Sequence, residues 1–217
     1  MATVVALMDR DSFEADTDVL VIVDPGERTL LWVPRDLWCE ALGDRVNRAF
    51  ALGGQALLGS ALAEHGITAG HGICLLRRAV EAGLAGLTVT MSVRRRLEFW
   101  YPLEPRRPIE EGRKRIVFEP PIERLSAERI HQWMGARYAV EGPDGDLGRI
   151  QRQQELIAVL GDGFDFARFL DGVGDIRVSG KAAIHEVAQA RWNWAFKIMG
   201  GLEPAKLRGK EVLMGAG

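Results

Sequence analysis

The sequence lacks the features of several protein classes. Its longest apolar runs are well short of the roughly 20 residues that cross a bilayer, so no transmembrane helix is expected in this chain. The N-terminus becomes acidic within a few residues, unlike a signal peptide, and the sequence as it stands is predicted to be cytoplasmic. The formal net charge is only −2, which gives no reason to expect a nucleic-acid partner.

Cysteine and the common catalytic signatures are also scarce. Cys39 and Cys74 are far apart and form no CxxC motif; one disulfide could form, but two unpaired buried thiols are favoured. The four histidines show no metal-binding spacing, and no GxSxG motif is present. The segment 172–181 resembles a phosphate loop, but Asp175 replaces a required glycine and Ala182 stands where Ser or Thr should follow the lysine.

What remains is the composition of a soluble globular protein. The chain has 217 residues, 47% hydrophobic and 27% charged, which suits one large domain. Apolar runs predict strands over Thr3–Met8, Asp18–Asp24 and Arg28–Val33, and the short turn DPGE makes the last two an antiparallel hairpin.

Further along, no repeat, low-complexity tract or linker interrupts the chain, so a single domain of mixed α/β type is predicted over 1–217. The other predicted elements are helices over Arg45–Gly66 (broken at Gly53 and Gly54), Ile73–Gly83, Ser126–Tyr138 and Lys181–Met199, a strand over Leu87–Val93, and a basic loop with at most one short strand over Arg94–Pro121.

Two aspartates flank the predicted hairpin. Residues of its two strands lie opposite one another when their numbers add to about 52, a condition that Asp16 and Asp36 meet, with Cβ atoms roughly 4.5–5.5 Å apart. Two carboxylates this close repel unless a cation, a shared proton or an arginine lies between them. Arg35 is adjacent, and oxygen ligands suit Mg²⁺. The alternative is that both aspartates are simply exposed beyond the strand ends, where Asp is common.

The stretch GPDGDLGRIQRQQ begins a predicted helix near Asp146. At about 100° per residue, Arg149 and Gln153 fall on the same side as the apolar residues. An inward arginine needs a partner, because a buried unpaired charge is expensive, and the positive end of the helix dipole favours an anion. The alternative is that Asp144 or Asp146 pairs with Arg149 and caps the helix without any ligand.

Five motifs in order resemble the LytR-CpsA-Psr family of bacterial cell-wall phosphotransferases. The similarity extends from Thr3 to about Leu160, and 161–217 is then predicted to be a C-terminal helical extension of the same domain. The motifs are DTDVLVIVDPGERTLLWVPRD (Asp16–Asp36), RVNRAFALGG (Arg45–Gly54), VEAGLAGLTVTM (Val80–Met91), LSAERIHQWMGARY (Leu125–Tyr138) and GDLGRIQRQQ (Gly145–Gln154).

This resemblance implies a fold, a reaction and a set of partners. The fold is a twisted central mixed β-sheet flanked by helices on both faces, which buries a polyprenyl chain in an apolar tunnel. The reaction transfers a glycan or anionic cell-wall polymer from a polyprenyl-pyrophosphate carrier to an acceptor hydroxyl on peptidoglycan or another glycan, with Mg²⁺. Members of the family are membrane-anchored and extracytoplasmic.

Position in the motifs also implies roles for individual residues. These roles suit phosphoryl transfer, which depends on positioning and charge neutralisation, and arginine forks match phosphate oxygens. The implied set is Asp16 and Asp36 beside the metal; Arg35, Arg137 and Arg149 on the phosphates, with Gln153 and Arg45 assisting; and Asp146 as the base for the acceptor hydroxyl or as the group that orients Arg149.

The sequence departs from the family pattern at three places. Glu14 stands where the family has an arginine, Gly135 replaces the first arginine of an Arg-x-Arg pair, and the N-terminal membrane anchor is missing. Three hypotheses remain open: an active phosphotransferase, a non-catalytic module that binds a polyprenyl phosphate or another long-chain anionic lipid, and a diverged scaffold with a collapsed pocket.

Overall fold

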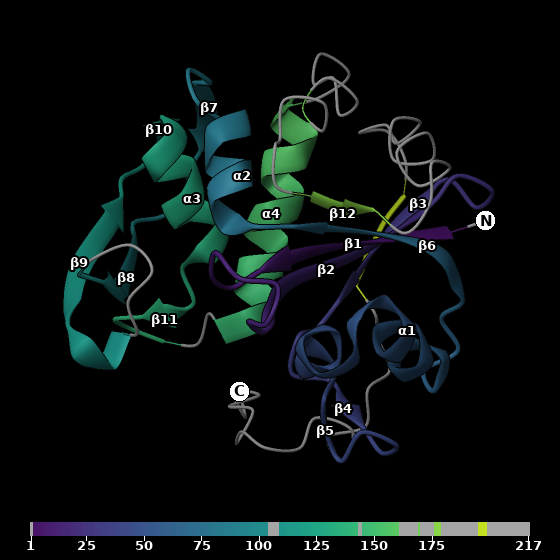
Figure 1. Cartoon of the computed structure of the whole chain (residues 1–217). Coiled ribbons are helices and arrows are strands. Elements are labelled where there is room, and N and C mark those ends of the chain that lie inside the picture. Colours follow the sequence, from purple (N-terminus) through teal and green to yellow (C-terminus); the bar gives the residue numbers. More distant parts are fainter. Residues whose placement is uncertain are drawn as a thin grey trace. The chain divides into compact units, whose positions relative to one another are not determined.

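The computed structural model describes residues 2–103, 109–142, 145–160, 169, 176–178 and 195–198. They belong to two compact units (Figure 1). Unit 1 comprises the described residues up to Gly83 together with two later strands, and unit 2 comprises those from Leu84 to Leu160. The single domain predicted over 1–217 stays a prediction.

Unit 1 is built on a mixed sheet. Its described strands follow the order β12-β6-β1-β2-β3-β13, in which β1, β2 and β3 are antiparallel neighbours, while β6 runs parallel to β1 and β13 parallel to β3. Their bounds are β1 (Ala2–Met8), β2 (Thr17–Asp24), β3 (Thr29–Val33), β6 (Ala69–Leu75), β12 (Ile176–Val178) and β13 (Ala195–Ile198).

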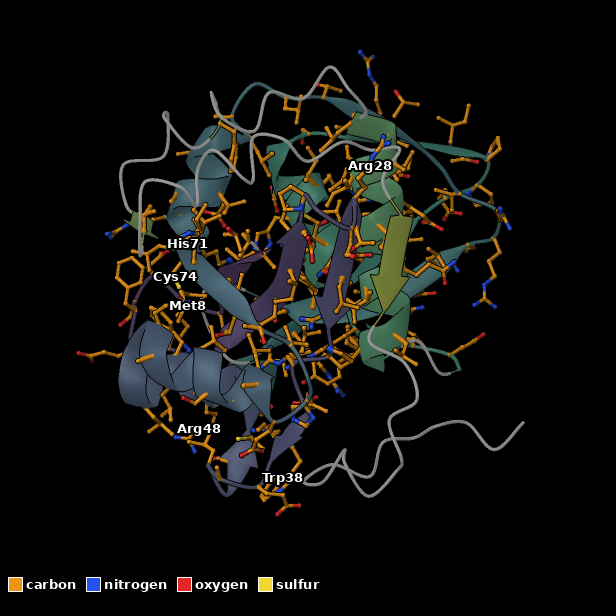
Figure 2. The ribbon with its side chains drawn as sticks, turned by 90° about the vertical axis from the view of Figure 1, so that its right-hand side faces the viewer. Met8, Arg28, Trp38, Arg48, His71 and Cys74 are labelled. Atoms are coloured by element: carbon orange, nitrogen blue, oxygen red, sulfur yellow. The ribbon has the colours of Figure 1, made fainter. Side chains whose placement is uncertain are left out.

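Helices cover this sheet on both sides. Helix α1 (Ala49–Ala63) and helix α2 (Arg77–Gly83) lie on opposite sides of it in both views (Figures 1 and 2). The strands between them are apolar on both faces, and Val4 and Ala6 of β1 are fully buried, as are Leu58 and Leu62 of α1. The predicted α/β class with a central mixed sheet is confirmed.

A short segment connects β3 to α1. It contains β4 (Trp38–Cys39), β5 (Asp44–Arg45) and the 3₁₀ turn η1 (Val46–Arg48). Helix α1 is interrupted where the sequence predicted a break: Gly53 has φ −153° and ψ 20°, and Gly54 has φ 62° and ψ −155°. Gly54 lies in a region that only glycine adopts without strain.

Unit 2 contains two small antiparallel sheets and two helices. One sheet pairs β7 with β10, the other has the order β11-β8-β9, and helices α3 and α4 contact each other. Phe99, Phe118 and Trp133 form its aromatic core, with ring centroids of Phe118 and Trp133 4.9 Å apart. The bounds are β7 (Val89–Ser92), β8 (Leu97–Pro102), η2 (Ile109–Glu111), β9 (Arg113–Phe118), β10 (Ile122–Leu125), α3 (Ala127–Gly135), β11 (Tyr138–Ala139) and α4 (Gly145–Leu160).

The predicted basic loop over Arg94–Pro121 is wrong. It is a hairpin of β8 and β9 in which Phe99 and Ile116 face the core while Arg113 and Arg115 are exposed. The arginines alternate with apolar residues at the period of a strand, and this alternation was the signal that the charge obscured.

Two predicted helices are also partly wrong. The helix over Ile73–Gly83 is a strand up to Leu75 and a helix only from Arg77, because the run ICL is buried beside β1 as its parallel neighbour. In the helix over Lys181–Met199, residues 195–198 form β13, and the rest lies outside the described residues. Helix α3 begins as predicted after Ser126 but ends at Gly135.

Candidate functional site

The hairpin of unit 1 brings Arg35 against Asp18. Leu20 opposes Val33 and Asp24 opposes Thr29, so the register is displaced by one residue from the predicted one. Arg35 is only 5% exposed, and its Nη1 donates to Asp18 Oδ1 at 2.6 Å. Sequence reasoning missed Asp18, although the one-residue tolerance in the predicted register included it.

Asp16 and Asp36 are not directly opposed, and each contacts its own arginine. Arg45 Nη1 lies 2.8 Å from Asp36 Oδ1, and Arg48 Nε lies 3.6 Å from Asp16 Oδ1. Figure 2 shows Arg48 at the start of α1. Arginines therefore neutralise both aspartates, which is one of the arrangements expected of close carboxylates. Arg35 and Arg45 lie in this group, as predicted.

The same region contains buried polar side chains without partners. Thr17 Oγ1, Arg35 Nε and both amide atoms of Asn47 are buried and find no hydrogen-bond partner among the described residues. Asn47 is held beside Arg35, because its backbone N–H donates to the Arg35 carbonyl at 3.2 Å. Buried polar groups are almost always satisfied, so these atoms indicate water or a polar ligand in this part of unit 1. Sequence reasoning quoted Asn47 within a motif but gave it no role.

In unit 2, Arg149 is buried and paired with an aspartate. Arg149 is 2% exposed, and its Nη2 donates to Asp146 Oδ1 at 2.5 Å, in the first turn of α4. The inward direction predicted for Arg149 is confirmed, and so is the pairing with Asp146 that was the alternative to a ligand. Asp146 Oδ2 is buried and has no partner among the described residues, so this carboxylate keeps one oxygen for another donor.

Gln153 and its neighbour Arg152 cap helix α3. Gln153 Nε2 donates to the Met134 carbonyl at 3.0 Å, and Arg152 Nε donates to the Trp133 carbonyl at 3.1 Å. A second bond joins Arg152 Nη2 to the Ala136 carbonyl. These contacts satisfy carbonyls that a helix end leaves unpaired and place positive charge at the negative end of its dipole. Both residues are buried, and both have a structural task that sequence reasoning did not foresee.

Arg137 follows the end of α3 and is incompletely satisfied. Its Nη2 donates to the Tyr138 hydroxyl at 3.0 Å, and its guanidinium lies 5.0 Å from the centre of that ring. Its Nη1 is buried without an acceptor among the described residues. A cationic donor in that position favours an anionic acceptor.

The two sequence departures have different surroundings. Glu14 is exposed, and its backbone N–H donates to Ser12 Oγ. Gly135 is helical, and a Cβ atom there would lie 3.5 Å from Tyr101 Oη, an ordinary contact. A larger residue at Gly135 would therefore start without a clash.

The metal prediction was examined against the donor set. In the described part of the chain, no three His, Cys, Asp or Glu side chains gather as a metal site. Mg²⁺ commonly binds through one or two carboxylates and takes its other ligands from water and substrate phosphates. Asp16 and Asp36 have the right donor chemistry for that mode, but each also contacts an arginine.

The fold can be compared with known proteins. No protein-family model and no curated protein sequence matches the chain. Among solved structures, B. subtilis TagV has a TM-score of 0.61 at 15% identity over 95% of this chain and 88% of its own. TagT bound to LI-WTA gives 0.58 at 19% identity, over 91% and 76%, and the protein gbs0355 from Streptococcus agalactiae gives 0.64 at 16%, over 91% and 76%.

The chain has a LytR-CpsA-Psr-like fold. TagV and TagT belong to that family, and they are similar to this chain over almost its whole length. At these identities the likeness concerns the fold alone. None of the described helices of this LytR-CpsA-Psr-like chain is long and apolar enough to span a membrane.

Proposed function

We propose that this protein binds a polyprenyl-pyrophosphate-linked glycan or anionic cell-wall polymer and transfers it to an acceptor hydroxyl. The observation that carries the proposal is a pair of buried arginine donors without acceptors, Arg35 Nε in unit 1 and Arg137 Nη1 in unit 2. An arginine N–H does not lose its proton, so burial without an acceptor is costly, and a phosphate oxygen satisfies it well.

The known proteins of this fold support the choice of ligand. TagT has been solved with LI-WTA, a wall teichoic acid, and TagT shares the fold of this chain. For this chain, the acceptor is inferred to be a peptidoglycan or glycan hydroxyl, and the compartment would be the one that contains those substrates. The apolar tunnel for the polyprenyl chain is part of the proposal.

The proposed reaction is a displacement at phosphorus. The acceptor oxygen forms a bond to the glycan-bearing phosphorus, the bond to the bridging oxygen breaks, and polyprenyl phosphate leaves with that oxygen. Arg35, Arg149 and Arg137 neutralise the phosphate charge, and Arg45 and Gln153 assist through their contacts with Asp36 and the end of α3. Asp146 orients Arg149 through Oδ1, and its Oδ2 is the candidate acceptor for the hydroxyl proton.

Mg²⁺ belongs to this proposal as a partner of the substrate. Asp16 and Asp36 would hold it, and the ion would supply further neutralisation of the phosphates. Because Arg45 already contacts Asp36 at 2.8 Å, we expect Mg²⁺ to bind weakly without a phosphate ligand and more tightly with one.

The second candidate function is a non-catalytic module for a polyprenyl phosphate or another long-chain anionic lipid. Glu14 and Gly135 favour it, because two positions that resemble phosphate-binding arginines carry no positive charge here. The two functions share the ligand class and differ in turnover.

The test measures polyprenyl phosphate released from a lipid-linked glycan with acceptor and Mg²⁺. We expect release by the wild type and a loss of at least ten-fold in Arg35→Gln. The control is Arg28→Gly, at the turn joining β2 and β3, the far end of the hairpin from Arg35; Arg28 has φ 53°, so glycine removes a charge there without strain.

The outcomes separate the candidates. Turnover that depends on Arg35 but not on Arg28 supports the transferase. Binding of the lipid by calorimetry, with no turnover across several donors and acceptors, favours the module. A wild-type protein that neither binds nor turns over any of these lipids contradicts both.

A further inference from the structure

A tyrosine and a histidine form a close pair in unit 2. Tyr101 belongs to β8 and is buried, and His131 belongs to α3 and is half-buried. The Tyr101 hydroxyl and His131 Nδ1 are 2.7 Å apart, and the two rings meet edge to face with centroids 6.3 Å apart. This geometry fixes the imidazole, because one ring nitrogen is held and the ring plane is packed.

The pair borders the space beside Gly135. Gly135 lies one helical turn after His131 and therefore on the same face of α3. A Cβ atom at Gly135 would lie 3.5 Å from Tyr101 Oη and 3.8 Å from His131 Cε1. The Cε1 atom separates the two ring nitrogens, so the imidazole edge lies where a side chain at Gly135 would extend.

An anion is expected near this end of α3. Arg137, two residues beyond Gly135, has the buried donor without an acceptor. A helix C-terminus normally disfavours an anion, but Arg152 and Gln153 already bond to the last carbonyls and neutralise that end. A protonated histidine near a helix C-terminus is itself stabilised by the dipole.

We propose that the imidazolium form of His131, held by Tyr101, binds a phosphate oxygen of the lipid-linked substrate and supplies the positive charge that Gly135 lacks. This rests on the function proposed above. In the imidazolium both ring nitrogens are donors: Nδ1–H donates to Tyr101 Oη and Nε2–H to the phosphate. When the ring loses its proton, the site loses its charge, so substrate affinity follows pH.

The other charged groups on the surrounding elements do not produce this switch. Lysine, arginine and carboxylate side chains ordinarily keep their charges between about pH 5.5 and 8, whereas histidine titrates near 6.5. Lys114 and Glu128 lie 3.7 Å apart and Arg129 contacts Glu123, so these charges are locally balanced. The groups are Lys114 of β9, Glu123 of β10, Glu128 and Arg129 of α3, and Asp146, Arg149 and Arg152 of α4.

The experiment measures affinity by calorimetry at pH 5.5 and pH 8. The probe is a short isoprenyl pyrophosphoryl-N-acetylglucosamine, in which both phosphates are esterified and keep their charge over this range. We expect the wild type to bind about ten-fold more tightly at pH 5.5, the usual scale of one charge-assisted hydrogen bond. His131→Gln should bind weakly at both values.

A gain of function distinguishes a phosphate ligand from a structural histidine. In the double variant His131→Gln/Gly135→Arg, a permanent charge enters the same space, and we expect tight binding at both pH values. His71→Gln, in β6 of unit 1, is the matched control and should keep the wild-type pH dependence.

Each remaining outcome decides against the proposal. A wild-type pH dependence retained in His131→Gln overturns it. So does a wild-type affinity independent of pH, even if His131→Gln binds more weakly, because that result indicates a packing role. If the wild type does not bind the probe at either pH, the proposed function fails, and this inference fails with it.

Discussion

The Asp146–Arg149 pair allows a quantitative test of whether the start of α4 is a cap or an anion site. Asp146→Asn keeps the shape of the side chain and removes its charge, which leaves Arg149 buried at 2% exposure without its carboxylate. Removing one partner of a fully buried pair costs about 3–5 kcal/mol. Asp146 is 21% exposed, so solvent screening lowers this figure to about 2–3 kcal/mol, including a few tenths for an acid in the first helical turn.

The assay is urea unfolding of Asp146→Asn, Arg149→Met and the double variant. We expect a coupling free energy of about 2 kcal/mol between the two sites, because the double variant leaves no charge buried alone. Glu119→Gln is the control: Glu119 pairs with Arg96 at 3.0 Å, but both side chains are exposed, so its loss should change stability by at most about 0.5 kcal/mol.

A ligand then separates the two interpretations. If the site binds phosphate, pyrophosphate should stabilise Asp146→Asn more than the wild type, because the anion replaces the lost carboxylate beside Arg149. Equal stabilisation of both proteins would show that the pair is a cap alone. A change below about 0.5 kcal/mol in Asp146→Asn would refute the electrostatic reasoning altogether.

Three further predictions concern stability and reactivity. Gly54→Ala should destabilise the protein by about 1–3 kcal/mol in urea unfolding, since Gly54 has φ 62°, whereas Gly59→Ala in open space within α1 should stabilise it by about 0.5–1 kcal/mol; equal effects would contradict this. Burial alone would raise the pKa of Glu64, but two backbone N–H groups and the Cys39 thiol outweigh it and hold that pKa below its usual value. The stability this provides is present above about pH 4.5 and is lost as the pH falls through the lower folded value, so Glu64→Gln should flatten the acid limb of a stability–pH curve. Burial raises the pKa of Cys39, and Cys74 is equally buried, so both thiols should react with a disulfide reagent only as fast as the protein unfolds; rapid native-state labelling would contradict this.

Local pattern predicted most of unit 1. The β-branched run of β2, the turn that follows it and the apolar β3 fixed the hairpin, and the paired glycines fixed the interruption of α1. Pattern failed where two signals overlapped. In β9 the arginines masked an alternation of period two, and at the start of the Ile73–Gly83 segment an apolar run too short to distinguish strand from helix became a strand because β1 lies beside it.

The candidate site was predictable in residue type more than in pairing. The helical projection placed Arg149 inward, because 3.6-residue periodicity depends only on the chain itself. Asp18, rather than Asp16 or Asp36, is the partner of Arg35, because a displacement of one residue in a hairpin changes which side chains meet. Nothing local indicated that Arg152 and Gln153 would cap α3.

By itself the sequence determined the elements whose periodicity is internal, the inward face of α4 and the departures at Glu14 and Gly135. Only the tertiary structure decided which carboxylate each arginine meets, which arginine donors are left without an acceptor, and that a tyrosine–histidine pair borders the space at Gly135. The physical reason is that hydrogen bonds and ion pairs depend on distances of a few ångströms between residues far apart in the chain. Those distances are set by packing, and periodicity does not encode them.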